Sequence, residues 1–336
     1  MHLARRLTSV SLRCALLSLV AMSARAELPQ APALLADLGY TPGEIAQVQA
    51  GGLVRGTIQP ASDRELVASL AFHLKASPTD LVKRIQSDLL DRVDPSVTSF
   101  GLVPGEGSLA DFAKLTLAPD ASKRAQAYLN AAPGGDLNLS SEEIAAFRRL
   151  GSGAAPSAVE QQLRNALLAR LQAYRARGLA GMAPYARSSG AQRSPADELR
   201  TATTATKPLA RYVPAAEQLL LDYPQSKPSG TLESYRWSQF VAHGVPTIAL
   251  THVLLVPDGN AWVVVQRQFY VSAGYNVEQA VAAFVPVQSG TVVVYGNRTS
   301  TDQITGFGGE AKRSIGSKLL ESQLESLFEK ARAATP

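Results

Sequence analysis

The segment 247–271 constrains the fold more than any other part of this 336-residue chain. Residues 247–256 (TIALTHVLLV) and 261–271 (AWVVVQRQFYV) are rich in β-branched and aromatic side chains, which favour strands. The sequence Pro257-Asp258-Gly259-Asn260 lies between them, and a turn of this composition between two strand-like runs predicts a β-hairpin. We therefore expect an antiparallel sheet in this part of the chain.

Other segments of the C-terminal block extend this prediction. Residues 232–240 (LESYRWSQF) and 290–301 (GTVVVYGNRTST) have the composition of strands, whereas 274–287 fits either a short helix or a strand. A long amphipathic helix closes the chain, with an expected apolar stripe of Ile315, Leu319, Leu324, Leu327, Phe328 and Ala331.

The N-terminal half is expected to consist of short helices. Capping boxes, in which a hydroxyl and a glutamate satisfy the first backbone amides of a helix, are predicted at 41–44, 62–65 and 140–143. Ser77-Pro78 is typical of another helix start, because proline is favoured at the first helical position. The predicted fold class is therefore α+β, with a mostly helical N-terminal half and a C-terminal antiparallel sheet covered by a long C-terminal helix.

The first 26 residues have the pattern of a secretory signal peptide. Three arginines precede the short apolar run 14–22, and Ala24-Arg25-Ala26 matches a signal peptidase site that would leave Glu27 as the new N-terminus. The run is too short to span a bilayer, and no second long apolar segment follows. We therefore expect a periplasmic or secreted protein with no transmembrane segment in its mature chain.

Removal of this leader changes the charge and the available chemistry. The leader contains four of the 33 Lys and Arg residues, so the mature chain would have 29 basic residues against 28 acidic ones. Because this balance is nearly even, charge gives no support for a nucleic-acid partner. The single cysteine, Cys14, also leaves, which excludes disulfides, thiol nucleophiles and cysteine metal sites from the mature chain.

Charge also divides the chain into blocks: an acidic one at 27–150, a linker and basic helical segment at 151–211, and a neutral one at 212–336. We expect the first block to form a small helical domain and the last a separate α+β domain. The stretch 150–157 (LGSGAAPS) has the composition of a linker. An apolar stripe follows, formed by Val159, Leu163, Leu167, Leu171 and Tyr174. The opposite face of this helix holds Arg164, Arg170 and Arg175, and the basic segment continues to Lys207 and Arg211. These side chains fit either a site for an anionic ligand or membrane surface, or a solvated face that offsets the acidic block; we favour the second interpretation.

The sequence Gly306-Phe-Gly308-Gly309-Glu-Ala311 matches the glycine pattern of a dinucleotide-binding loop. That fold requires the glycines directly after a strand and a further strand after the helix, but residues 298–305 intervene and the sequence ends at Pro336 without another strand pattern. We therefore expect these glycines to form a bend, with Gly316 and its flanking serines allowing close helix packing. Anion binding by Lys312 and Arg313 is the remaining alternative.

No catalytic signature is found in the sequence, and no cofactor or metal site is predicted. If the strands pair as expected, five side chains share one face of the sheet because each lies on an alternating set: Glu233, Tyr235, His252, Arg267 and Arg298. This group is the candidate ligand-binding site.

The layout of residues 230–334, antiparallel strands followed by a long helix, resembles helix-grip (START-like) domains in architecture alone. The resemblance implies a hydrophobic ligand held between the sheet and the C-terminal helix.

Two functions fit these observations. The first is a non-enzymatic exported protein that binds a small or lipid-like ligand, or a protein partner of the cell envelope, through its C-terminal α+β domain. The second is a periplasmic hydrolase-type enzyme that uses Glu233, His252 and Arg267. The absence of a nucleophile motif in the sequence favours the first.

Overall fold

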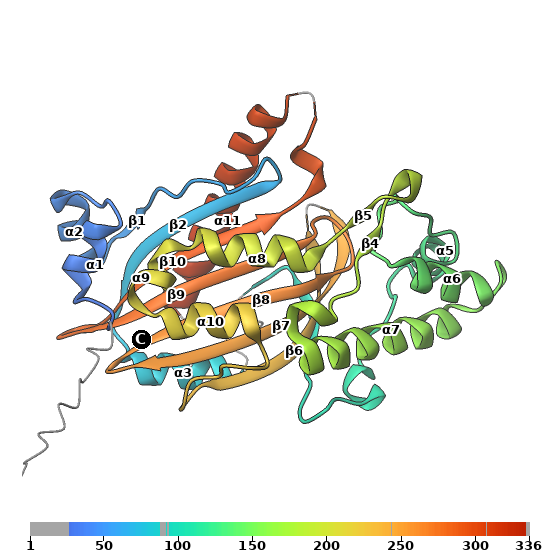
Figure 1. Cartoon of the computed structure of the whole chain (residues 1–336), viewed down its shortest axis with the longest axis horizontal. Helices are drawn as coiled ribbons and strands as arrows, with labels where there is room; N and C mark the ends of the chain where they lie inside the picture. The colour runs from blue at the N-terminus through green and yellow to red at the C-terminus, as the bar shows by residue number, and fades with distance from the viewer. Residues whose placement is uncertain (1–26, 88–91, 93, 243, 307, 334–336) are drawn as a thin grey trace, which may run out of the picture.

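The computed structural model describes residues 27–333 except 88–91, 93, 243 and 307, so the expected leader lies outside the described residues. One large antiparallel sheet organises the chain (Figure 1). Its strands are β1 (Leu53–Arg55), β2 (Glu65–Leu74), β3 (Val97–Leu102), β6 (Leu232–Ala242), β7 (Val245–Asp258), β8 (Ala261–Val271), β9 (Val277–Val287) and β10 (Gly290–Ser300). They lie in the order β1-β2-β10-β9-β8-β7-β6-β3. The α+β fold class and the 247–271 hairpin are thus confirmed, and 274–287 contains a strand.

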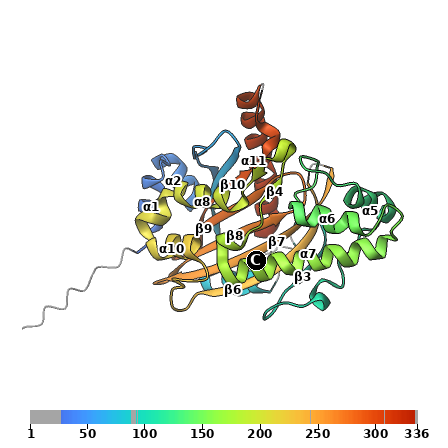
Figure 2. The same cartoon turned by 45° about the vertical axis from the view of Figure 1, so that its right-hand side comes forward.

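Helices cover both faces of this sheet (Figures 1 and 2). One face, here called the cavity face, packs against α1 (Ala31–Asp37), α2 (Pro42–Gln49), α5 (Ala121–Leu129), α6 (Ser141–Arg149), α7 (Pro156–Arg177), α8 (Pro195–Ala205), α9 (Lys207–Tyr212) and α10 (Pro214–Asp222). The opposite face packs against α3 (Pro78–Gln86) and α11 (Gly309–Ala333). Because both faces are covered, β7 is buried almost without interruption from Thr247 onward instead of alternating between buried and exposed positions.

The first block also contains strands β1, β2 and β3, which its sequence pattern did not predict. The capping boxes at Thr41 and Ser140 and the proline start at Ser77 are confirmed. The box predicted at 62–65 is wrong, because Glu65 begins β2 and its carboxylate accepts a hydrogen bond from the Ala61 amide at 2.5 Å. A capping signature is local, whereas β2 is stabilised by pairing with β10, more than 200 residues later in the chain.

The compositional blocks do not coincide with separate layers of the fold. Strand β2, from the acidic block, pairs with β1 on one side and with β10 of the C-terminal block on the other. At the opposite edge, β3 pairs with β6. Residues 27–150 and 212–336 therefore share one sheet, and the segment between them contributes α7, α8 and α9 to the covering layer.

The stripe from Val159 to Tyr174 faces the core along α7, as predicted. One arginine of the expected solvated face is instead buried: both Nε and Nη2 of Arg170 bind the Glu143 carboxylate, at 2.7 and 2.6 Å. This bidentate pair joins α7 to the start of α6.

Helix α11 packs on β2 through a narrower stripe than expected. Leu324 is buried, and the Phe328 ring lies 4.7 Å from that of Phe72. Ile315 and Leu319 were predicted to face the core, but they are 61% and 52% exposed, respectively. The helix packs mainly on β2, near the edge of the sheet, and leaves the side of Ile315 and Leu319 exposed. The stripe predicted from periodicity alone is therefore wrong at these two positions.

The glycines before α11 form a bend, as expected. Gly306 and Gly308 have φ values of 79° and 71°, which side chains rarely adopt. A Cβ atom at Gly316 would lie 2.7 Å from the Leu66 side chain, and Ser317 Oγ accepts a hydrogen bond from the Val67 amide at 3.2 Å. These contacts show that small residues let the helix approach β2 closely.

Candidate functional site

A row of polar side chains crosses the cavity face from β6 to β10. The strand register places Tyr235 opposite His252, His252 opposite Arg267, Arg267 opposite Gln279, and Gln279 opposite Arg298. All five are buried. The structure therefore brings four of the expected residues into one row, and the fifth, Glu233, lies next to it on β6. Gln279 was missed because its segment could not be assigned to a strand from sequence.

His252 is enclosed at one end of this row. Its Nε2 lies 3.2 Å from Glu233 Oε2, and its Nδ1 lies 3.1 Å from the Tyr174 hydroxyl. The Tyr235 ring stacks on the imidazole with a centroid distance of 4.3 Å, and Tyr223 contacts it edge-on. In a neutral imidazole one nitrogen donates and the other accepts, so Nε2–H donates to Glu233 while Nδ1 accepts from Tyr174.

The electrostatics of this group support that assignment. Burial lowers the pKa of His252 to about 4, although the Glu233 carboxylate acts in the opposite direction. The hydrogen bond from His252, assisted by Lys227 at 2.8 Å, lowers the pKa of Glu233 to about 2. At neutral pH the pair is therefore a carboxylate beside a neutral imidazole. His252 has no exposed surface, so its ring cannot contact a substrate in this arrangement.

The two arginines of the row hold helices on the sheet. Arg267 donates to the Leu220 carbonyl in the last turn of α10 at 2.8 Å and to Gln279 Oε1 at 2.7 Å. Arg298 donates to the carbonyl of Ala205, the last residue of α8, at 3.2 Å. Helix C-termini carry partial negative charge and unpaired carbonyls, which explains why buried cations lie there. Arg298 also pairs with Glu65 at 2.7 Å.

A cavity of about 830 Å³ lies beside Arg298 on the same face of the sheet. The sheet forms the floor of this cavity, and three residues of the floor are small: Ser69 on β2, Ala283 on β9 and Gly296 on β10. Gly296 lies between Val281 and Ser69 in the strand register, and a Cβ atom added to it would meet no atom within 4 Å. The absence of a side chain at Gly296 therefore contributes to the volume of the cavity.

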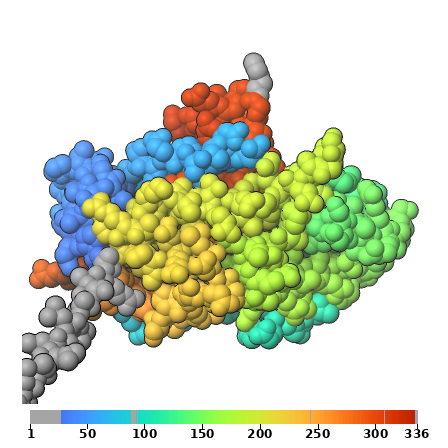
Figure 3. All heavy atoms as spheres, viewed as in Figure 1, coloured from blue at the N-terminus to red at the C-terminus, as the bar shows by residue number. Residues whose placement is uncertain are grey.

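The walls come from segments far apart in the chain. They are formed by α1, by residues 58–61, and by the region where α8, α9 and α10 meet. The apolar lining residues on these walls are Leu28, Leu34, Leu38, Ile58, Ala61, Ala205, Pro208, Leu209, Tyr212 and Val213. Figure 3 shows the yellow surface of α8–α10 directly beside the blue surface of the N-terminal segments. The lining of the cavity is therefore mostly apolar, with charged side chains at Asp37, Lys207, Arg211 and Arg298.

Asp37 joins two of these walls. Its carboxylate accepts a short hydrogen bond from the Tyr212 hydroxyl and lies 3.2 Å from an Arg211 guanidinium nitrogen. These contacts connect α1 to α9 at the rim of the cavity. Among the lining residues, the sequence pointed only to Arg298 and to Lys207 and Arg211 of the basic segment, because residues from α1, β2, α9 and β10 meet only after the sheet has formed.

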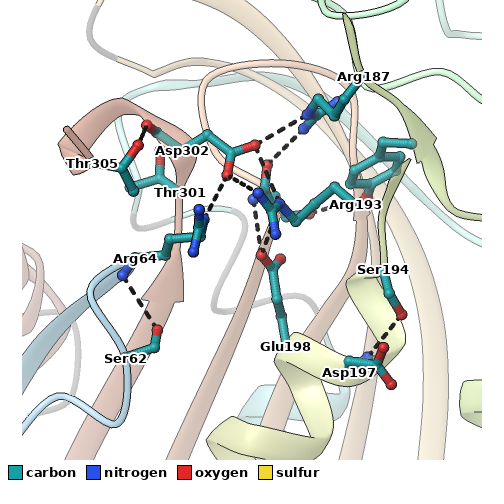
Figure 4. Close-up of polar contacts among 12 residues, drawn as sticks. Ser62, Arg64, Arg187, Arg193, Ser194, Asp197, Glu198, Thr301, Asp302 and Thr305 are labelled. Carbon is teal, nitrogen blue, oxygen red and sulfur yellow. Dashed lines mark hydrogen bonds and ion pairs between the residues drawn. The ribbon is translucent and has the colours of Figure 1, made fainter. Parts of the chain in front are cut away.

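A second polar cluster lies at the end of β10 (Figure 4). The carboxylate of Asp302 is 3.0 to 3.1 Å from guanidinium nitrogens of Arg64, Arg187 and Arg193, and Arg193 also lies 3.6 Å from Glu198. Burial alone would raise the pKa of Asp302, but the hydrogen bond from Arg187 and the charge of Arg193 lower it. Arg193 lies in β5 (Gln192–Arg193), which pairs with β4 (Tyr185–Ala186) in a small two-stranded sheet, and Arg187 directly follows β4. The cluster thus fixes this hairpin to the main sheet.

The remaining predicted residues lie elsewhere. Arg313 donates to the Asp63 carbonyl at 3.2 Å, and Lys312 is exposed on the first turn of α11. The structure does not bring either of them to the cavity. Among residues 27–333 outside the gaps, no cluster of three metal-binding side chains and no membrane-spanning helix is present.

Comparison of the chain with protein-family models, with curated proteins and with solved structures finds no match. The geometry of the site departs from the helix-grip expectation, since the cavity lies on the face opposite to α11.

Proposed function

We propose that this protein, exported and cleaved before Glu27, binds a small apolar or lipid-like molecule in the cavity beneath α8 and α9. The observation that carries the proposal is the cavity of about 830 Å³, whose floor is formed in part by Ser69, Ala283 and Gly296. Binding sites for small molecules are concave, largely apolar and typically of 300 to about 1,000 Å³, with a few polar groups that orient the ligand.

The polar row supports binding rather than catalysis. His252 and Arg267 have no exposed surface, and their polar atoms are engaged by Glu233, Tyr174, Gln279, Thr203 and the Leu220 carbonyl. In a hydrolase these groups would have to reach a substrate. In the described arrangement they fix α7, α10 and the strands around the cavity.

Calorimetric titration with uncharged straight-chain alcohols tests this function. We expect 1-hexanol, 1-octanol and 1-decanol to bind at one site, with an affinity that rises roughly fourfold for each methylene buried. Bound alcohol should also raise the Tm, and at equal concentration the tighter-binding alcohol should raise it more, because stabilisation grows with the logarithm of ligand concentration over Kd. Failure of all three alcohols to bind or to change the Tm would contradict the proposal.

Intact mass of the product in the periplasmic fraction tests export, because a species that retains residues 1–26 would contradict cleavage at Glu27.

A further inference from the structure

The charges around the cavity indicate which apolar molecules it would select. Among the described residues, three cationic side chains line it, Lys207, Arg211 and Arg298, and one carboxylate does, Asp37. Arg298 is buried and its charge is matched by Glu65 at 2.7 Å. The positive charge that remains therefore lies toward the solvent side, on α9.

Lys207 and Arg211 are four residues apart on α9, so they project from the same side of the helix. Both are exposed, and Lys207 forms no ion pair with a carboxylate among the described residues. Arg211 pairs with Asp37, but the two side chains are 64% and 41% exposed. Exposed ion pairs contribute little stability, so an incoming anion can replace or extend this contact.

From this arrangement we infer that the ligand is a single-chain amphiphile with an anionic headgroup, a carboxylate or a phosphate. The inference rests on the proposed function and specifies its ligand class. The hydrocarbon chain would lie over Val281, Ala283 and Gly296, and the headgroup would contact Lys207 and Arg211 at the rim. A neutral or cationic headgroup would leave the Lys207 charge without a partner.

The test compares ligands that differ only in the headgroup. Decanoate, decyl phosphate, 1-decanol and decyltrimethylammonium are titrated below their critical micelle concentrations at about 50 mM and about 500 mM salt. We expect decanoate or decyl phosphate to bind roughly five- to tenfold more tightly than 1-decanol at low salt, and this advantage to shrink at high salt because solvent screens exposed charges. The tighter of the two anions identifies the headgroup chemistry. The cationic amphiphile should bind most weakly.

Lys207→Gln is the matched variant, since the residue is exposed and the change should not affect folding. We expect it to weaken binding of the preferred anion at least threefold and to leave the affinity for 1-decanol unchanged. Lys312→Gln, an exposed lysine that does not line the cavity, should change neither.

The outcomes distinguish the proposed function from the inference about the headgroup. If 1-decanol binds as tightly as both anions, and Lys207→Gln has no differential effect, the headgroup inference is wrong while the proposed function stands. If none of the four compounds binds, the proposed function fails and the inference fails with it.

Discussion

Arg298 on β10 and Glu65 at the start of β2 form a buried ion pair, with Nη1 of the arginine 2.7 Å from Oε2 of the glutamate. Burial raises the pKa of Glu65, and the arginine acts against this effect. The pair lies beside the cavity and joins strands that are more than 200 residues apart in the sequence. It therefore connects the N-terminal part of the fold to the site.

We expect Glu65→Gln and Arg298→Met each to lower the free energy of unfolding by about 3–5 kcal/mol, because either change leaves one buried group without its partner. The double variant should lose less than the sum of the two single losses. Urea unfolding of the four proteins measures this coupling. Strictly additive losses would show that the two side chains do not interact in solution.

The neutral state of His252 predicts a specific pH dependence. Its pKa is about 4 in the folded protein and near 6.5 when unfolded, so folding favours the deprotonated ring. This contribution is fully present above pH 6.5 and decreases as the pH falls toward 4. The loss is on the order of 3 kcal/mol. Glu233 loses its own contribution only at lower pH, since its folded pKa is about 2.

Denaturant unfolding at pH 7 and pH 4.5 measures this effect, with His252→Gln as the comparison. The variant should be less stable than the wild type at pH 7, and the difference between them should shrink at pH 4.5. An equal difference at both pH values would contradict the burial of a neutral His252.

The packing of α11 predicts unequal effects for its leucines. Leu324→Ala should lower the free energy of unfolding by about 2–4 kcal/mol, because it empties a buried position against the sheet. Leu319→Ala should change it by less than about 0.5 kcal/mol, because that side chain is 52% exposed. Thermal unfolding compares the two, and equal losses would mean that the helix is rotated relative to the structure described.

The shared sheet predicts that residues 212–336 do not fold alone. Without β2, strand β10 loses a neighbour along its whole length, and without α7–α9 the cavity face of the sheet is exposed. We expect a fragment of 212–336 to show no cooperative unfolding transition, in contrast to 27–336. A cooperative transition in the fragment would instead support the separate domain that the change in composition suggests.

Local signals in the sequence predicted the elements better than their arrangement. The hairpin at 247–271 was predictable because both strands and their turn have strong local preferences. Strand β2 was not, because the capping signature at 62–65 points to a helix and its partner β10 is remote. Most of the polar row was predicted from the alternation of side chains along strands, because residues an even number of positions apart lie on the same face. The cavity was not, because Gly296, Leu34 and Leu209 become neighbours only in the folded chain.

Binding of 1-decanol to Gly296→Leu tests the central claim most directly. An added Cβ atom at Gly296 meets nothing within 4 Å, so a leucine side chain would extend into the cavity without displacing the sheet. Gly153→Leu is the control, because Cβ is equally unobstructed there and the residue does not line the cavity. Circular dichroism and Tm verify that both variants fold, and Ala283→Leu, from the same floor, is a second filling variant. We predict that calorimetry will show at least tenfold weaker binding to Gly296→Leu and unchanged binding to Gly153→Leu. Wild-type affinity in folded Gly296→Leu and Ala283→Leu would contradict the assignment of this cavity as the ligand site.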